Sequence, residues 1–337
     1  MTEAAADGDA QPIPIRVVIV TMYESIGETD TEVGEYRIWA DRPAFAERLP
    51  FPISDEPLAL DRSRGVLVVN TGVGTARAAA TITALGLDPR FDLTRSYWLV
   101  AGVAGGNARL VPLASACWAE WVVDGDLAHQ IDGREIPADW DTGFIPLFRS
   151  RPYEQPRPSD QWGNVYHLDP GLVDWAYQLT RNVAITPPVG LEAWLATFSA
   201  SEAAAKPPIV MKGDTLSTAT FWHGHWMNDW ASDWVRYWTD GAGTFATSAM
   251  EDTGTLAALT RLAVAGRVDR DRVLVLRTTS NFTAQPDEQT AAESLAVESA
   301  SFSAKGAAVE AAYAVGRVVV DEIVDTWDRA AATIPRT

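Results

Sequence analysis

The feature that most constrains the fold is the alternation of short, β-branched apolar runs with alanine-rich segments. The runs are typical of buried strands, and the segments between them have the composition of helices. The strand-like runs lie at residues 15–20, 66–70, 97–102, 118–123, 208–213, 244–250 and 273–280. Helices are expected near residues 74–86, 171–182, 220–238, 252–264, 288–298 and 302–327. This order predicts an α/β fold with a mainly parallel central sheet flanked by helices.

Two regions depart from this alternation. Residues 1–14 are acidic and lack the basic and apolar parts of a signal peptide, which predicts a disordered leader and a cytoplasmic protein. Residues 133–165 are rich in Pro, Asp and Arg and have no steady periodicity, which predicts an inserted loop or lid. Candidate site residues occur on both sides of that insertion, so we expect one domain over residues 15–330.

Charge and composition exclude several classes of partner. The formal net charge of −18 argues against nucleic acid and anionic membranes, because such a surface repels polyphosphate. No window approaches 18 consecutive apolar residues, so no membrane insertion is expected. The single cysteine, Cys117, cannot form a disulfide within the chain and has the apolar setting of a buried thiol. A small neutral molecule is therefore a more suitable ligand for this acidic surface than nucleic acid or an anionic membrane.

Two glycine turns follow strand-like runs. In TGVGTARAAA, residues 71–80, Gly72 and Gly74 allow a tight turn whose backbone N–H groups face an oxygen-rich ligand. In VAGVAGG, residues 100–106, Gly105 lets the backbone approach a planar ligand. Ordinary loop glycines are the alternative for both turns. The third glycine and the acidic partner of the dinucleotide fingerprint are missing, which argues against NAD.

The segment SAMEDTG, residues 248–254, ends a strand-like run and opens a helix. The carboxylate of Glu251 suits the two vicinal hydroxyls of a ribose, and the thioether of Met250 can lie against the sugar or the base. The alternative is structural, with Met250 in the core and Glu251 in the first turn of the helix, where its charge suits the dipole.

A second candidate segment is KGDTLSTATFWHG, residues 212–224. Asp214 is expected at a strand end, where it either contacts the ligand or caps the local backbone. Trp222 is a candidate to stack on a base. The next three tryptophans share one helical face, which is expected in the core or at an oligomer interface: Trp226, Trp230 and Trp234. His223 and His225 lack metal-ligand spacing, so no metal is expected.

The run VLRTTSNFT, residues 275–283, ends with Ser280 and Asn281. An amide can donate to N7 of a purine and accept from its 6-substituent. A donor at N7 stabilises the negative charge that develops on a departing base when an N-glycosidic bond breaks. The alternative is an asparagine that only serves a turn.

In their order along the chain, these motifs resemble a known superfamily. IRVVIVTMYE, TGVGTARAAA, VAGVAGG, WAEWVVDGDLAHQID, KGD, SAMEDTG and TTSN are similar to the nucleoside phosphorylase and 5′-methylthioadenosine nucleosidase superfamily, over roughly residues 15–327. WHG, MEDTG and RTTSNF are more closely similar to the purine nucleoside permease family. The resemblance implies a single α/β domain whose mixed sheet curls into a partial barrel, a homo-oligomeric assembly and a purine nucleoside as ligand.

The resemblance also implies roles for single residues. Met250 and Glu251 match the pair whose carboxylate grips the ribose hydroxyls. Asn281 stands where nucleosidases and hexameric phosphorylases carry an aspartic acid, whereas trimeric purine phosphorylases use an asparagine. Because an amide cannot deliver a proton, cleavage would rely on hydrogen bonding to the base or on another acid. The 6-oxopurine nucleosides then join adenosine as expected substrates.

The identity of the nucleophile decides the reaction class. Hexameric phosphorylases carry an arginine where this chain has the apolar residues 99–101, and Arg77 and Arg37 remain as alternative phosphate ligands. We therefore favour water, with Glu24 as the expected base, in a nucleosidase without metal or cofactor. The alternatives are a phosphorylase that uses inorganic phosphate as co-substrate, and a non-catalytic nucleoside-binding protein that assists uptake.

Overall fold

The computed structural model describes residues 11–24, 33–155, 163–188, 190–191, 203–298 and 304–337. Its centre is a mixed sheet built around four parallel strands, in the order β5, β2, β7 and β16. These strands are β2 (Val17–Thr21), β5 (Val66–Asn70), β7 (Tyr97–Gly106) and β16 (Val273–Phe282). All residues of β2 and β5 are buried, as expected for parallel strands that are covered on both faces.

The remaining strands extend this centre on both sides. Those of the same sheet are β3 (Glu47–Leu49), β4 (Leu58–Asp61), β8 (Ala116–Ala119), β9 (Trp121–Asp124), β12 (Val165–His167), β13 (Val210–Lys212), β14 (Asp214–Ser217) and β15 (Phe245–Ala249). Two short separate pairs are β1 (Ile13–Pro14) with β6 (Phe91–Asp92), and β10 (Ala128–Gln130) with β11 (Phe144–Pro146).

The long strand β7 joins the two halves of the sheet. One of its edges pairs with β16 from Trp98 to Gly106. The other edge pairs with β2 in its first half and with β15, antiparallel, at Gly105 and Gly106. The candidate glycine turn over residues 100–106 is therefore strand, and it lies where three strands meet.

The sheet curls at a bend between β8 and β9. The carboxylate of Asp214, which is buried, accepts hydrogen bonds from the backbone N–H groups of Glu120, Trp121 and Thr244. These bonds satisfy backbone donors that the strands leave unpaired at the bend. Among the described residues the strands curl around β7 and β16 without forming a closed barrel.

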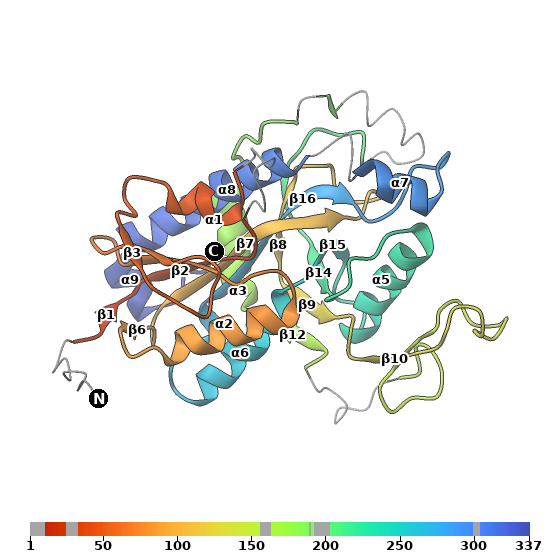
Figure 1. The fold of residues 1–337 in the computed structure, drawn as a ribbon, viewed down its shortest axis with the longest axis horizontal. Helices are drawn as coiled ribbons and strands as arrows, with labels where there is room; N and C mark the ends of the chain where they lie inside the picture. Colours follow the sequence, from red (N-terminus) through yellow and green to blue (C-terminus); the bar gives the residue numbers. More distant parts are fainter. Residues whose placement is uncertain (1–10, 25–32, 156–162, 189, 192–202, 299–303) are drawn as a thin grey trace, which may run out of the picture.

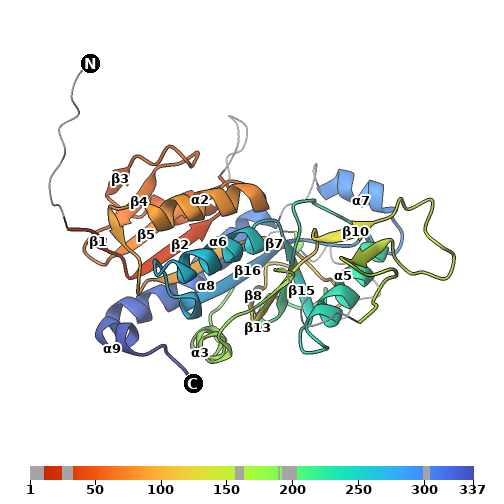
Figure 2. The same cartoon turned by 90° about the horizontal axis from the view of Figure 1, so that it is seen from below.

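Helices cover both faces of the sheet. They are α1 (Glu35–Ala40), α2 (Thr75–Leu87), α3 (Pro170–Thr180), α5 (His225–Trp238), α6 (Asp252–Val264), α7 (Ala291–Glu298), α8 (Lys305–Asp325) and α9 (Trp327–Ala332). Helices α2 and α6 lie side by side on one face, and α1 and α8 lie together on the other (Figures 1 and 2). Helix α5 packs beside β14 and β15 (Figure 1). The predicted α/β class is confirmed.

Several local predictions were wrong. The aromatic helix begins at His225 and not near residue 220, because Gly224 at its start has a φ of 133° that only glycine adopts without strain. Trp230 and Trp234 are buried and belong to the core, whereas Trp226 is 83% exposed, so of the two expected roles only an interface remains for it. The strand expected over residues 118–123 is broken at Glu120 into β8 and β9.

The two irregular regions are also partly structured. Most of the predicted leader lies outside the described residues, but Ile13 and Pro14 pair with β6. In the predicted lid, residues 144–146 form β11, which pairs with β10, while residues 156–162 lie outside the described part. Within the described chain, no helix has both the length and the apolar character needed to cross a bilayer.

Candidate functional site

The candidate site lies at the carboxyl ends of the parallel strands, where ligands bind in open α/β sheets. It has two parts. The first is a buried cluster of charged side chains, Glu35, Glu251, Asp252 and Arg277, of which none is more than 5% exposed. The second is the junction of Gly105 with Asn281 at the ends of β7 and β16.

Glu251 is held between two helix starts. It follows β15 and directly precedes α6, and its Oε1 atom accepts the backbone N–H of Gly74, just before α2, at 3.1 Å. Its Oε2 atom accepts the N–H of Met250 at 3.2 Å. Burial raises the pKa of Glu251, while the Arg277 guanidinium opposes that rise. The predicted Met-Glu pair and the predicted glycine turn are therefore in contact. The glycine of the turn that binds the carboxylate is Gly74 and not Gly72.

The last residue of the MEDTG motif explains this close meeting. A Cβ atom on Gly254 would lie 2.1 Å from the backbone oxygen of Thr75, so no larger residue fits where α6 crosses the start of α2. The Thr75 hydroxyl also donates to the Met250 carbonyl at 3.0 Å. Gly72, whose φ is 75°, lies in the same turn, next to the side chain of Arg77.

Arg277 is the positive centre of the cluster. From β16, its Nη2 atom lies 2.6 Å from Oδ1 of Asp252 and 3.2 Å from Oε2 of Glu251, and its Nη1 atom donates to the Val103 carbonyl at 3.0 Å. Burial would lower the pKa of Arg277, but Asp252 and Glu251 outweigh that effect and raise it. The guanidinium therefore stays charged and fixes both carboxylates.

Glu35 completes the cluster from the first residue of α1. Its carboxylate accepts the backbone N–H groups of Met22, at 2.8 Å, and of Val103, at 2.7 Å. A Cβ on Gly102 would lie 2.6 Å from its Oε1 atom, so glycine is required for this approach. Burial raises the pKa of Glu35 to about 7, against the lowering effect of Arg277. A carboxyl group with such a pKa exchanges protons near neutral pH.

The junction of β7 and β16 presents an amide. The pairing of β16 with β7 shifts register between Thr279 and Asn281, which is a β-bulge at Ser280. Asn281 then pairs with Gly105, and its Nδ2 atom lies 3.5 Å from where a Cβ of that glycine would be. The Ser280 hydroxyl donates to Oδ1 of Asn281 at 3.1 Å. The Asn281 Nδ2 atom donates to the Phe282 carbonyl at 3.2 Å, so both side chains are held at this strand end.

Three other candidate residues have contacts within the protein. The carboxylate of Asp214 binds backbone N–H groups at the bend between β8 and β9. Trp222 is buried among Trp230 and Phe245, with ring centroids at 6.2 and 6.0 Å, in the aromatic core beside α5. Glu24 accepts the N–H groups of Gly34 at 3.0 Å and Arg37 at 2.8 Å, so it caps the start of α1.

The sequence reasoning missed Glu35, Asp252 and Arg277. Glu35 was missed because α1 was not predicted, so the search for a carboxylate stopped close to Met22. Arg277 had a visible signal, since it is a charged residue inside an apolar strand-like run, and such a residue is buried only with partners. The sequence could therefore have predicted a buried ion pair between Arg277 and Asp252.

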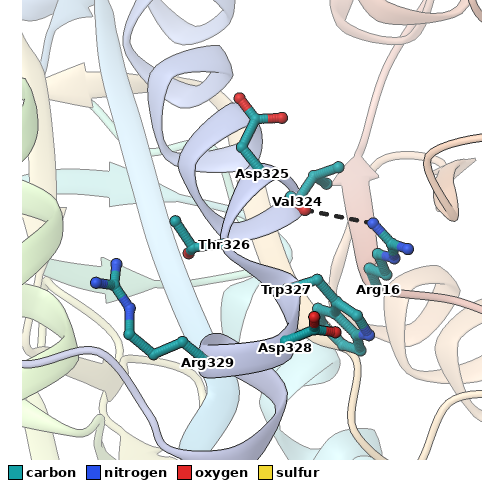
Figure 3. A pocket seen from close by; sticks show the side chains of 7 residues that line it. All are labelled: Arg16, Val324, Asp325, Thr326, Trp327, Asp328 and Arg329. Carbon is teal, nitrogen blue, oxygen red and sulfur yellow. Dashed lines mark hydrogen bonds between the residues drawn. The ribbon is translucent and has the colours of Figure 1, made fainter.

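A surface cavity of about 380 Å³ lies away from this cluster (Figure 3). It is lined by Arg16, before β2, by the end of α8 and by the start of α9, including Trp327 and Arg329. Arg16 lies over the Trp327 ring and donates to the Val324 carbonyl at 3.3 Å. This cavity is at the amino end of β2, opposite to the end that carries the candidate site.

Solved structures of low sequence identity share this fold. The 5′-methylthioadenosine/S-adenosylhomocysteine nucleosidase of Helicobacter pylori superposes with a TM-score of 0.54 at 14% identity, over 91% of this chain and 98% of that one. The futalosine hydrolase of the same organism superposes with a TM-score of 0.53 at 15% identity, with the same coverage of 91% and 98%. These similarities establish the architecture.

Sequence relatives establish the family. The purine nucleoside permease of Candida albicans is 31% identical over 265 residues, which are 77% of this chain and 64% of that protein, so the chain spans less than two thirds of that relative. A probable purine nucleoside permease of Schizosaccharomyces pombe is 30% identical over 267 residues, 77% of this chain and 76% of that protein. The family model described as purine nucleoside permease matches residues 14–335. The chain therefore belongs to the purine nucleoside permease family.

Proposed function

We propose that this protein binds purine nucleosides and cleaves their N-glycosidic bond, with water as the nucleophile. The observation that carries the proposal is that one buried cluster holds both Glu251, at a strand end, and Glu35, a carboxyl group whose pKa is raised to about 7. Glu251 suits the ribose hydroxyls, and Glu35 suits a general base. A nucleosidase and a futalosine hydrolase of Helicobacter pylori share this fold, which supports the proposal.

In the proposed reaction, Glu35 takes a proton from water while the water oxygen bonds to the anomeric carbon. The N-glycosidic bond breaks, and its electron pair leaves with the purine. Asn281 donates a hydrogen bond to N7 of the departing base and so stabilises its negative charge. Positive charge that develops on the ribose ring is favoured by the carboxylates of Glu251 and Asp252. Glu35 replaces Glu24 as the proposed base.

The charge balance of the cluster favours water over phosphate. Three carboxyl groups, Glu35, Glu251 and Asp252, surround the guanidinium of Arg277, which already binds two of them. An incoming phosphate would meet excess negative charge in a buried site, where such repulsion is poorly screened. Of the alternative phosphate ligands, Arg37 pairs with Asp41 and Arg77 lies near Asp55, both at the surface.

The test is the release of free base from inosine, guanosine and adenosine by the purified protein, first without phosphate and then with phosphate added. Free ribose in phosphate-free buffer is the expected product. Ribose 1-phosphate that forms only after phosphate addition would make the protein a phosphorylase. Nucleoside binding without turnover in either buffer would favour the alternative that its relatives' names suggest, a binding protein that assists uptake.

A further inference from the structure

A buried polar network adjoins the strand end that carries Asn281 and takes no part in the proposed chemistry. It consists of the side chains of Asn107, Asn228 and Thr283, which are 2–3% exposed. Asn107 follows β7, Thr283 follows β16, and Asn228 belongs to α5, which packs beside the sheet (Figure 1). Three elements that are distant in sequence therefore meet through polar groups, whose burial costs free energy unless each group is hydrogen-bonded.

The hydrogen bonds of the network run in one line. The Thr283 hydroxyl has two acceptors, Oδ1 of Asn228 at 2.6 Å and the Gly106 carbonyl at 3.1 Å. Nδ2 of Asn228 donates to Oδ1 of Asn107 at 3.4 Å. Nδ2 of Asn107 donates in turn to the Phe245 carbonyl, at the start of β15, at 3.2 Å. These hydrogen bonds connect the end of β16 to α5, and α5 to the end of β7 and the start of β15.

The network reaches the base-binding junction through Thr283. The Thr283 N–H donates to the Gly106 carbonyl at 2.9 Å, next to the pairing of Asn281 with Gly105. The Thr283 methyl group lies 2.9 Å from the Cβ position of Gly105, and the Asn281 amide lies 3.5 Å from the same position. The threonine methyl and the asparagine amide therefore flank the same glycine. Because a bulge at Ser280 interrupts the ladder just before, the strand end needs another anchor to hold its register.

We propose that Asn228, acting through Thr283, is a positioning residue for the Asn281 amide and so sets the recognition of the purine N7 edge. This inference rests on the proposed function, because it concerns how the same site discriminates its base. It gives the aromatic helix α5 a role in the site without direct ligand contact: the helix anchors the strand end that carries Asn281.

The test compares inosine with 7-deazainosine, in which a C–H replaces N7. Thr283→Val keeps the methyl group beside Gly105 but removes the hydroxyl, and Thr283→Ser keeps the hydroxyl. We expect Thr283→Val and Asn228→Leu to lower the kcat/KM ratio of inosine over 7-deazainosine by about three- to tenfold, the size of one neutral hydrogen bond. Thr283→Ser should retain the ratio. In an Asn281→Ala background, Thr283→Val should leave the ratio unchanged, because the two residues act as one unit.

A matched control separates positioning from stability. Thr180, at the end of α3, is also fully buried, accepts from Trp118 Nε1 at 2.9 Å and donates to the Ala176 carbonyl at 2.7 Å. Thr180→Val should lower the melting temperature without changing the ratio. If the wild type is active and both Thr283→Val and Asn228→Leu keep its ratio, the positioning role alone is overturned. A wild type that neither binds nor cleaves inosine would overturn the proposed function, and this inference with it.

Discussion

The Nη2 atom of Arg277 donates to Oε2 of Glu251 at 3.2 Å, and both side chains are buried. This contact joins the strand β16 to the start of α6, and the same guanidinium holds Asp252 at 2.6 Å. The fixed Arg277 cation and the Gly74 N–H orient the Glu251 carboxylate before a ligand binds. Little additional conformational entropy is therefore lost when a ligand contacts this carboxylate.

Glu35→Gln should reduce base release by about 100-fold or more, because a positioned general base contributes roughly 10²- to 10⁴-fold to a rate. Glu24→Gln is the matched control: its carboxylate binds the backbone of Gly34 and Arg37, so turnover should change little. Wild-type turnover should rise with pH through about 7, as Glu35 loses its proton. Equal losses in the two variants would refute the assignment of the base to Glu35.

The stability of the protein should depend on the protonation of Glu35. The folded-state pKa of about 7 lies above the ordinary value of 4.5, so the folded protein is favoured with Glu35 protonated. That contribution is fully present below pH 4.5 and is lost as the pH rises through 7. Relative to wild type, Glu35→Gln should gain up to about 3 kcal/mol of unfolding free energy between pH 4 and 9. Urea titrations at several pH values measure this gain, and parallel stability curves would contradict it.

Glu251→Gln should weaken nucleoside binding by about tenfold to 100-fold. The amide keeps the shape of the side chain but loses the charge that strengthens both hydrogen bonds to the ribose hydroxyls. Glu47→Gln is the control, since Glu47 only pairs with Arg62 at the surface. Calorimetric titration with inosine measures the change. Unaltered affinity in Glu251→Gln would remove the ribose role of this residue.

Arg277→Met should destabilise the fold by about 3–5 kcal/mol, because it leaves Glu251 and Asp252 buried without their cation. The exposed Arg236, which pairs with Asp233 on α5, provides the control variant Arg236→Met, and that change should be nearly neutral. Chemical denaturation measures both free energies of unfolding. A loss below about 1 kcal/mol for Arg277→Met would show that the buried cluster contributes little to stability.

Asp214→Ala should lower stability by about 1–3 kcal/mol and leave the KM for nucleoside unchanged. Its carboxylate serves three backbone N–H groups at the bend between β8 and β9, so the cost is structural. Thermal melts and steady-state kinetics on the same sample separate the two effects. A raised KM with an unchanged melting temperature would restore the substrate-binding role that the sequence suggested.

Much of the fold was predictable because its signals are local. Continuous β-branched runs predict buried parallel strands, and β2 and β5 have the predicted character. The Met-Glu pair was identified because it lies at a junction of strand and helix, a short-range pattern. Helix α1 was missed because its six residues are too few for a clear period, so Glu35 was not among the candidate carboxylates.

By itself, the sequence determined the α/β class, the family and the position of Glu251, since these depend on composition, periodicity and motif order. Only the tertiary structure decided which carboxyl groups share a site. Glu35, Val103, Glu251 and Arg277 come from four separate segments, and the pKa of Glu35 depends on burial and on charges that those segments bring together. The same applies to Asp214 and Trp222, whose residue types suit a ligand but whose neighbours are backbone and core. Residue type sets what a side chain can do, and packing decides what it meets.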